Sequence, residues 1–184
     1  MILIIFVLSY LIGSFPSAFV LSKAIAHKDI LSLGDKNVGA RNVFHTVGKK
    51  VGLLTFLLDF LKGTLIWLLG SHFHLPFPLL FLTLFFGWLG HCFPIWLRFK
   101  GGKGVALIIG FLAPQHIVSA LLSAFLFIFI KKWVKDFDLS YTLTVVVFLV
   151  ILALQGTSFL LIMMISIVFL LPLTKDLLTK QKRE

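Results

Sequence analysis

The feature that most constrains this chain is a set of long stretches without a charged residue. Asp, Glu, Lys and Arg are absent from residues 1–22, 63–97, 104–130 and 139–174. A helix needs about 20 apolar residues to cross the hydrocarbon of a bilayer. The first stretch is therefore long enough for one span, and the second and fourth are each long enough for two. This pattern predicts an integral membrane protein built from helices.

Composition supports a lipid environment for the 184-residue chain. Hydrophobic residues make up 59% of it and charged residues 13%, whereas soluble domains carry about 25% charged residues. The formal net charge of +10 does not indicate nucleic-acid binding, because the basic residues lie between apolar runs and not on a solvated domain. We therefore expect membrane lipids, and no nucleic acid, as partners. The single cysteine, Cys92, and the scattered histidines predict no metal site, and we expect no cofactor.

Turn signals divide the long stretches into spans. Pro76 and Pro78 interrupt 63–97, because each proline lacks a backbone donor and disfavours helix in the residue before it. Gln155-Gly156-Thr157-Ser158 gives a softer break in the last stretch. Residues 104–130 allow two interpretations, one long span or two short helices folded at Ala113-Pro114-Gln115-His116.

The positions of the basic residues favour two short helices. Lys and Arg near the ends of spans stay on the cytoplasmic side. Two helices in 104–130 place the lysines at 131–135 on the same side as the basic loops at 22–50 and 98–103. The chain is then an all-α integral membrane protein of about seven transmembrane or partly spanning helices, in a single domain over 1–184. We expect its N-terminus outside and its C-terminus in the cytoplasm. We interpret the first apolar run as a span because it lacks the features of a secretory signal peptide.

The loop after the third predicted span is a candidate anion site. In Gly101-Gly102-Lys103-Gly104 the glycines let the backbone curl with exposed N–H groups around a cation. A helix predicted to begin near Val105 adds the positive end of its dipole. The alternative interpretation is a flexible basic turn held at anionic lipid head groups.

The first loop is a second candidate. Between Gly34 and Asn42 it combines glycines, cations and carboxamides, which both donate and accept hydrogen bonds. An ordinary cytoplasmic loop would explain the charges but not the density of Gly and Asn. This segment can therefore bind an anion and orient hydroxyl groups.

Polar residues also lie within the predicted spans. Asp59 and Lys62 stand three residues apart and share a helix face, where they can pair. Such groups at membrane depth indicate function or a structural lock between helices. The segment Gly13-Ser14-Phe15-Pro16-Ser17 kinks or unwinds the first span, for packing or to open a cavity. His91 either donates to a phosphate or satisfies a neighbouring carbonyl.

These segments, in this order, resemble the acyl-phosphate-dependent glycerol-3-phosphate acyltransferases of bacteria, which are small integral membrane enzymes with seven helices. The similar blocks are Gly13 to Ser17 with Asp29-Ile30, then Asn37 to Ala40, Asn42-Val43, Gly48 to Lys50 and Leu58 to Gly63, and then Gly90-His91, Phe93-Pro94 and Phe99 to Ala106. The resemblance implies transfer of a fatty acyl group from acyl phosphate to the 1-hydroxyl of glycerol 3-phosphate. The products are lysophosphatidic acid and inorganic phosphate, in an early step of phospholipid synthesis. The implied location is the bacterial inner membrane, with the active face toward the cytoplasm.

The loops and the resemblance together give a predicted site. We expect Lys103 and its glycines to hold the acyl phosphate and stabilise charge on the departing phosphate, and Asn37, Asn42 and His91 to orient the glycerol phosphate. The candidate catalytic residues are Lys103, His91 and Asn42. The candidate residues for binding phosphate and glycerol groups are Asn37, Gly39, Arg41, Gly101, Gly102, Gly104 and Ser14.

The chain departs from the family pattern at several positions. Asp35 and Lys36 replace a small pair, while Arg41 and Leu107 each replace a threonine. The family's third motif, a His-Arg-Glu-Asn run, has no counterpart in residues 171–176. The alternative function is a non-catalytic or specialised relative that binds acylated phosphates or anionic lipid, or a membrane partner of a true acyltransferase. A small transporter is disfavoured, because the candidate anion-binding groups cluster at one face.

Overall fold

The computed structural model describes residues 1–156, 162–163, 166–167 and 170, and every regular element among them is helical. The α-helices are α1 (Ile2–Ser14), α2 (Ser17–Ala26), α3 (Ala40–Thr46), α4 (Lys49–His72), α5 (Phe77–Cys92), α6 (Val105–Leu112), α7 (Ile117–Trp133) and α8 (Phe137–Leu154). Two short 3₁₀ helices are η1 (Ile30–Ser32) and η2 (Ile95–Leu97). The predicted all-α fold is confirmed.

The outer surface of the helices is apolar. Among the described residues, three segments are long and apolar enough to cross a membrane, namely Ile2–Ala26, Lys49–His72 and Phe77–Leu97. Large side chains such as Leu65 and Ile128 face outward. An apolar exterior of this extent suits contact with lipid and not with water. The chain is therefore a membrane protein.

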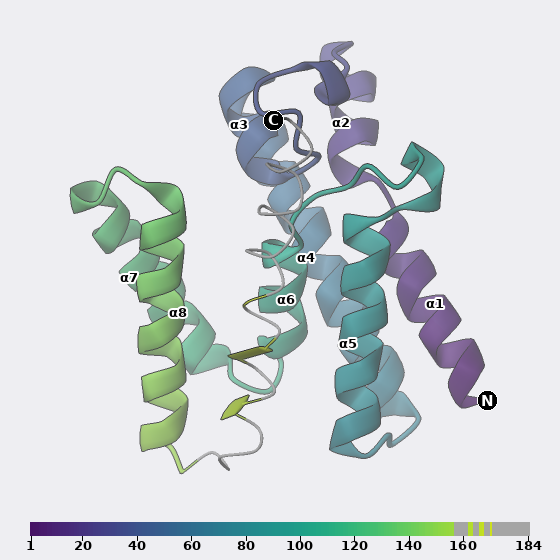
Figure 1. Ribbon diagram of the computed structural model, residues 1–184, viewed down its shortest axis with the longest axis vertical. Helices are drawn as coiled ribbons and strands as arrows, with labels where there is room; N and C mark the ends of the chain where they lie inside the picture. Colours follow the sequence, from purple (N-terminus) through teal and green to yellow (C-terminus); the bar gives the residue numbers. More distant parts are fainter. Residues whose placement is uncertain (157–161, 164–165, 168–169, 171–184) are drawn as a thin grey trace.

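α1 and α2 run in the same direction, and after them the long helices α4 to α8 run alternately in opposite directions, so the connections gather at two ends (Figure 1). The segments between α2 and α4, between α5 and α6, and between α7 and α8 lie toward the upper end in Figure 1. These three segments and the helix ends that flank them carry the basic residues of the predicted cytoplasmic loops. The turns after α4 and α6 lie toward the opposite end, with the N-terminus. The basic segments thus share one end of the fold, and the side of the membrane on which they lie stays a prediction.

The chain reverses where the turn signals predict. α4 ends at His72 and α5 begins at Phe77, and α6 ends at Leu112 before α7 begins at Ile117. Residues 104–130 thus contain two helices, as predicted. The structure adds two features: the first span is divided into α1 and α2, and the first loop contains the short helix α3. Most of the seventh predicted helix, and all of residues 171–176, lie outside the described residues.

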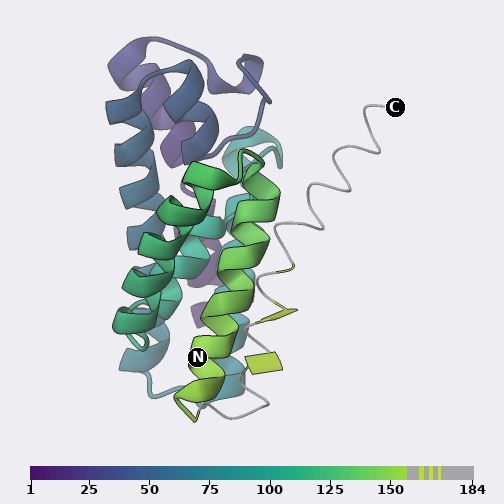
Figure 2. The same ribbon diagram turned by 90° about the vertical axis from the view of Figure 1, so that its left-hand side faces the viewer.

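Glycines bring the central helices into close contact. A Cβ atom on Gly13 would collide with the Gly87 carbonyl of α5, and one on Gly110 would collide with the Phe60 carbonyl of α4. Small residues let helix backbones approach in this way within membranes. α7 and α8 lie side by side as a hairpin beside this central group (Figures 1 and 2).

Two apolar clusters hold the elements around the candidate site. The larger one includes Trp88 of α5 together with Leu107 and Phe111 of α6. The smaller one joins α2, the first loop, α3 and η2, and its buried members are Ala18, Ile30, Val38, Val43, Val51 and Leu97. The smaller cluster fixes the first loop against the loop that follows α5.

Candidate functional site

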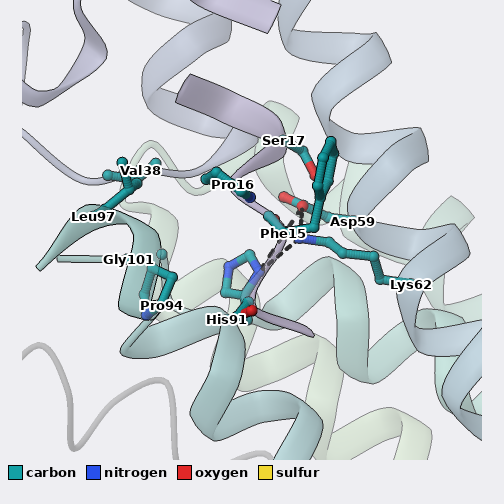
Figure 3. A pocket seen from close by; sticks show the side chains of 12 residues that line it. Phe15, Pro16, Ser17, Val38, Asp59, Lys62, His91, Pro94, Leu97 and Gly101 are labelled. Atoms are coloured by element: carbon teal, nitrogen blue, oxygen red, sulfur yellow. Dashed lines mark hydrogen bonds and ion pairs between the residues drawn. The ribbon is translucent and has the colours of Figure 1, made fainter. Parts of the chain in front are cut away.

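A small pocket lies between the break in the first span and the loop after α5 (Figure 3). Its lining residues are Ser14, Phe15, Pro16, Ser17, Val38, Asp59, Lys62, His91, Pro94, Leu97, Gly101 and Gly102. The first loop, predicted to bind the glycerol phosphate, and the glycine loop (Gly101 to Gly104), predicted to bind the acyl phosphate, therefore meet at one pocket. Of the candidate site residues, the pocket lining includes Ser14, Asp59, Lys62, His91, Gly101 and Gly102.

Asp59, Lys62 and His91 form a buried charged cluster in this pocket. Lys62 Nζ lies 2.8 Å from Asp59 Oδ1 and 3.4 Å from His91 Nδ1. The three residues expose only 3%, 6% and 7% of their surface, for Asp59, Lys62 and His91 in that order. Buried charges need partners of this kind, because removal from water is costly. The predicted pairing of Asp59 with Lys62 is confirmed, and His91 is added to it (Figure 3).

The break in the first span supplies Lys62 with two further acceptors. Pro16 has no N–H, and the Ser17 N–H, which would reach the Gly13 carbonyl in a continuous helix, donates to the Phe15 carbonyl at 3.0 Å. Lys62 Nζ donates to the Phe15 carbonyl at 2.8 Å and to the Gly13 carbonyl at 3.4 Å. The lysine thus joins the broken helix to α4.

Ser14 joins the same break to the loop after α5. Its hydroxyl donates to the Leu11 carbonyl at 2.9 Å and accepts from Trp96 Nε1 at 3.0 Å. Tyr10 makes a parallel connection, donating to the Phe93 carbonyl at 2.8 Å. These bonds give Ser14 a structural role, and its part in substrate binding stays a prediction.

The structure corrects one expectation about the glycine loop. The Gly101 N–H donates to the Cys92 carbonyl at 3.1 Å, and the Gly102 N–H donates to the His91 carbonyl at 3.2 Å. The sequence predicts that these two N–H groups are exposed toward an anion. They instead donate to α5, because the last carbonyls of that helix have no donors within the helix. Anion binding by Lys103 and by the N-terminus of α6 stays a prediction.

Gly102 lies where the two polar loops approach one another. A Cβ atom there would collide with His91 Nε2 and would stand 2.7 Å from the Val38 carbonyl. The Nε2 edge of the His91 ring therefore faces the glycine loop, while its Nδ1 edge faces Lys62.

Gly104 directly precedes α6 and has a φ of 86°, a conformation that glycine adopts without strain. Lys103, between Gly102 and Gly104, is half-buried, and its carbonyl accepts from Trp88 Nε1 at 2.9 Å.

Asn42 holds the first loop together. Its Nδ2 donates to the Leu33 carbonyl at 2.9 Å and to the Asn37 carbonyl at 3.0 Å, and the side chain is buried. The Asn37 N–H in turn donates to Asp35 Oδ1 at 3.0 Å. The amide hydrogens of Asn42 are thus engaged within the loop, and a direct contact between Asn42 and a substrate stays a prediction.

The remaining first-loop candidates lie beside the pocket and not in its lining. Gly39 precedes α3, and a Cβ atom on it would stand 2.9 Å from Asn37 Nδ2. Arg41 is exposed in the first turn of α3. Val38 is the residue through which this loop reaches the pocket.

Sequence reasoning missed Ser17. Its side chain is buried at 1% exposure, lines the pocket, and has a hydroxyl without a hydrogen-bond partner in the described structure. Figure 3 shows this hydroxyl directed toward Asp59. The sequence signal that could have indicated Ser17 is its position directly after Pro16, at the predicted break in the first span.

A model of the family described as glycerol-3-phosphate acyltransferase matches residues 3–177. The chain belongs to this family. One curated relative, glycerol-3-phosphate acyltransferase 2 of Lactobacillus acidophilus, is 44% identical to this protein over 67% of the chain. A second, glycerol-3-phosphate acyltransferase of Bartonella henselae, is 42% identical over 73% of the chain. The matched segments cover 59% and 62% of those two proteins, so the chain spans less than two thirds of their length.

Solved structures of the same family agree with the fold. The chain resembles the crystal structure of PlsY, an integral membrane glycerol 3-phosphate acyltransferase, in its glycerol 3-phosphate form. The TM-score is 0.82 at 29% identity, over 98% of this chain and 90% of PlsY. The lysophosphatidic acid form of PlsY gives a TM-score of 0.83 at 30% identity, over 95% of this chain and 87% of PlsY.

Proposed function

We propose that the protein transfers a fatty acyl group from acyl phosphate to the 1-hydroxyl of glycerol 3-phosphate. The new ester bond forms between the hydroxyl oxygen and the acyl carbon as the bond from that carbon to the phosphate oxygen breaks. The hydroxyl proton ends on the released phosphate, so the products are lysophosphatidic acid and inorganic phosphate. The observation that carries the proposal is the meeting of Val38, His91 and Gly102 at one pocket, in a chain of the acyltransferase family. PlsY, which has the same fold, has been solved in glycerol 3-phosphate and lysophosphatidic acid forms.

Lys103 and the N-terminus of α6 are the proposed site for the acyl phosphate. The lysine supplies a positive charge, and the first turn of a helix presents N–H groups and the positive end of its dipole. Phosphate is a good leaving group, so stabilising its charge and positioning the two substrates can lower the barrier without a protein nucleophile. The fatty chain would lie among the apolar helices.

Glycerol 3-phosphate is proposed to bind on the first-loop side of the pocket. His91 Nε2 lies beside Gly102, which approaches the Val38 carbonyl of the first loop, and Asn37 and Arg41 lie on that loop. Asn42 supports the site by holding that loop closed.

The proposed location is the bacterial inner membrane, with this site at the cytoplasmic face. Its support is the gathering of the basic segments toward one end of the helices (Figure 1). An N-terminus outside and a C-terminus inside complete the proposed topology, because basic residues near span ends stay in the cytoplasm. Membrane lipids surround the helices in this arrangement.

Phosphate release by the purified protein in detergent, with acyl phosphate and glycerol 3-phosphate, tests the function. We expect Lys103→Ala to abolish turnover while the protein elutes as the wild type does, because the departing phosphate loses its cation. Lys132→Ala, which removes an exposed lysine at the end of α7, is the matched control and should keep full activity. Release by the wild type that does not exceed the Lys103→Ala background would refute the proposed activity on these substrates.

The departures from the family pattern favour a second candidate function, a non-catalytic or specialised relative that binds acylated phosphates or anionic lipid. Asp35 brings a negative charge into the first loop, and residues 171–176 lack the third motif of the family. Acyl phosphate that binds to the purified protein without phosphate release would support this candidate.

A further inference from the structure

We propose that Lys62 is a positioning residue for His91. By donating to Nδ1, it fixes the neutral imidazole with its proton on Nε2, at the edge that faces Gly102 and the pocket. The benefit to acyl transfer rests on the proposed function, whereas the assigned tautomer rests on the contacts alone.

The donors and acceptors around Lys62 decide which nitrogen carries the proton. A lysine ammonium has three donors and no acceptor, and the Asp59 carboxylate at 2.8 Å stabilises its charge. Asp59 and the Phe15 carbonyl, each at 2.8 Å, take two of these donors, and the third is shared between the Gly13 carbonyl and His91 Nδ1, each at 3.4 Å. Because an ammonium cannot accept, Nδ1 is the acceptor in its contact with Lys62. Asp59 Oδ1 is 3.9 Å from Nδ1, which exceeds hydrogen-bond distance. The carboxylate consequently does not hold a proton on Nδ1, and a neutral ring carries its proton on Nε2.

The position of Lys62 is fixed from three directions. The partners of its ammonium are Asp59 on the same helix, the Gly13 and Phe15 carbonyls of the broken first span, and His91 at the end of α5. A buried side chain held by several partners keeps one geometry, as groups that orient a site must. The break at Pro16 therefore serves the site by supplying carbonyl acceptors to Lys62.

An N–H donor at Nε2 can contact a substrate in the pocket. Gly102 lies against the Nε2 edge of the ring and also approaches the Val38 carbonyl, and all three residues line the pocket. A donor at this edge can bind a phosphate oxygen or a substrate hydroxyl, whereas the other tautomer would present a lone pair to the anion. Lys62 thus acts on the substrate through the proton of His91.

Nitrogen NMR of labelled histidine tests the tautomer directly. The other five histidines, His27, His45, His72, His74 and His116, are not buried and can be replaced by Asn, so that His91 gives the only imidazole signals. At neutral pH we expect the Nδ1 resonance of an unprotonated nitrogen and the Nε2 resonance of a protonated one. A proton on Nδ1, or a doubly protonated ring, would overturn the inference.

Variants in the same background test the role of Lys62. Asp59→Asn with Lys62→Met removes both charges together, so that neither is left buried alone. We expect a mixture of tautomers and a kcat for phosphate release lower by at least about tenfold, with a smaller change in KM. Lys132→Met is the matched control and should change neither readout. A double variant with the tautomer and kcat of this control would refute the positioning role.

The two readouts separate the inference from the proposed function. If the predicted tautomer is found in a protein that releases no phosphate, the proposed activity fails and the assignment for His91 stands. If phosphate is released by a protein with the other tautomer, the positioning role fails and the activity stands. Should the double variant not fold, the spectrum of the single-histidine protein alone decides whether the inference holds.

Discussion

At the scale of residues, the site depends on contacts that leave no room for a side chain. Gly102 lies against the Nε2 edge of His91 on one side and near the Val38 carbonyl on the other. Its N–H is already donated to the His91 carbonyl. Gly102 therefore acts by being small, and its lack of a Cβ lets the two polar loops meet.

Gly102→Ala should lower activity because the new Cβ must displace the His91 ring or the Val38 carbonyl. Overpacking of this kind costs about 1–3 kcal/mol, and we expect kcat/KM for phosphate release to fall by about tenfold or more. Gly39→Ala is the comparison variant, since its Cβ would meet only the end of the Asn37 side chain. A loss at Gly102→Ala no larger than that at Gly39→Ala would contradict the packing argument.

At the scale of elements, helix backbones in contact determine where the site residues stand. α4 carries Asp59 and Lys62, and it packs against α6 at Gly63 and Gly110, where added Cβ atoms would collide with carbonyl groups of the facing helix. Lipid tails provide little hydrophobic driving force between spans, so close packing through small residues holds such helices together. The distance from Lys62 to the glycine loop that precedes α6 depends on this contact.

Gly110→Ala should therefore destabilise the fold, because its Cβ would push α6 away from the Phe60 carbonyl of α4. The expected loss is about 1–3 kcal/mol, measured as a lower Tm in detergent. Leu65→Ala, which shortens an outward-facing side chain of α4 with 52% exposure, should stay within about 0.5 kcal/mol of the wild type. Equal Tm values for the two variants would show that the helix contact does not determine stability.

At the scale of the whole molecule, charge and fold give the same orientation. The basic segments at 22–50, 98–103 and 131–135 lie toward one end, and the turn at 73–76 lies toward the other (Figure 1). In the proposed orientation these cations stay in the cytoplasm and the pocket lies near the inner face of the membrane. The proposed water-soluble substrate, glycerol 3-phosphate, could then reach it without crossing lipid.

Labelling with a membrane-impermeant thiol reagent tests this orientation. In a Cys92→Ala background, Lys36→Cys and Lys100→Cys should be protected in intact cells and labelled in inverted membrane vesicles. His74→Cys, in the turn after α4, should show the opposite pattern. Labelling of positions 36 and 100 from different sides would contradict the proposed site, because its two loops would face different compartments.

Much of the architecture is determined by the sequence, for a physical reason. Every backbone group within lipid must find its partner inside the protein, so apolar stretches of the lengths seen here form helices. Prolines end those helices at 73–76 and 113–116, and the three-residue spacing of Asp59 and Lys62 predicts their pairing. These features are local, and they could be inferred before any contact between helices was known.

Only the tertiary structure decides how the site is assembled. His91 is 29 residues from Lys62 in the chain, and the Gly13 carbonyl is 49 residues away. Their meeting depends on which helices pack together. The same packing decides that the Gly101 and Gly102 N–H groups point back to α5 and that the amide of Asn42 holds its own loop. The sequence alone indicates which residues can take part in binding and catalysis. Their hydrogen-bond partners are determined by how the helices pack.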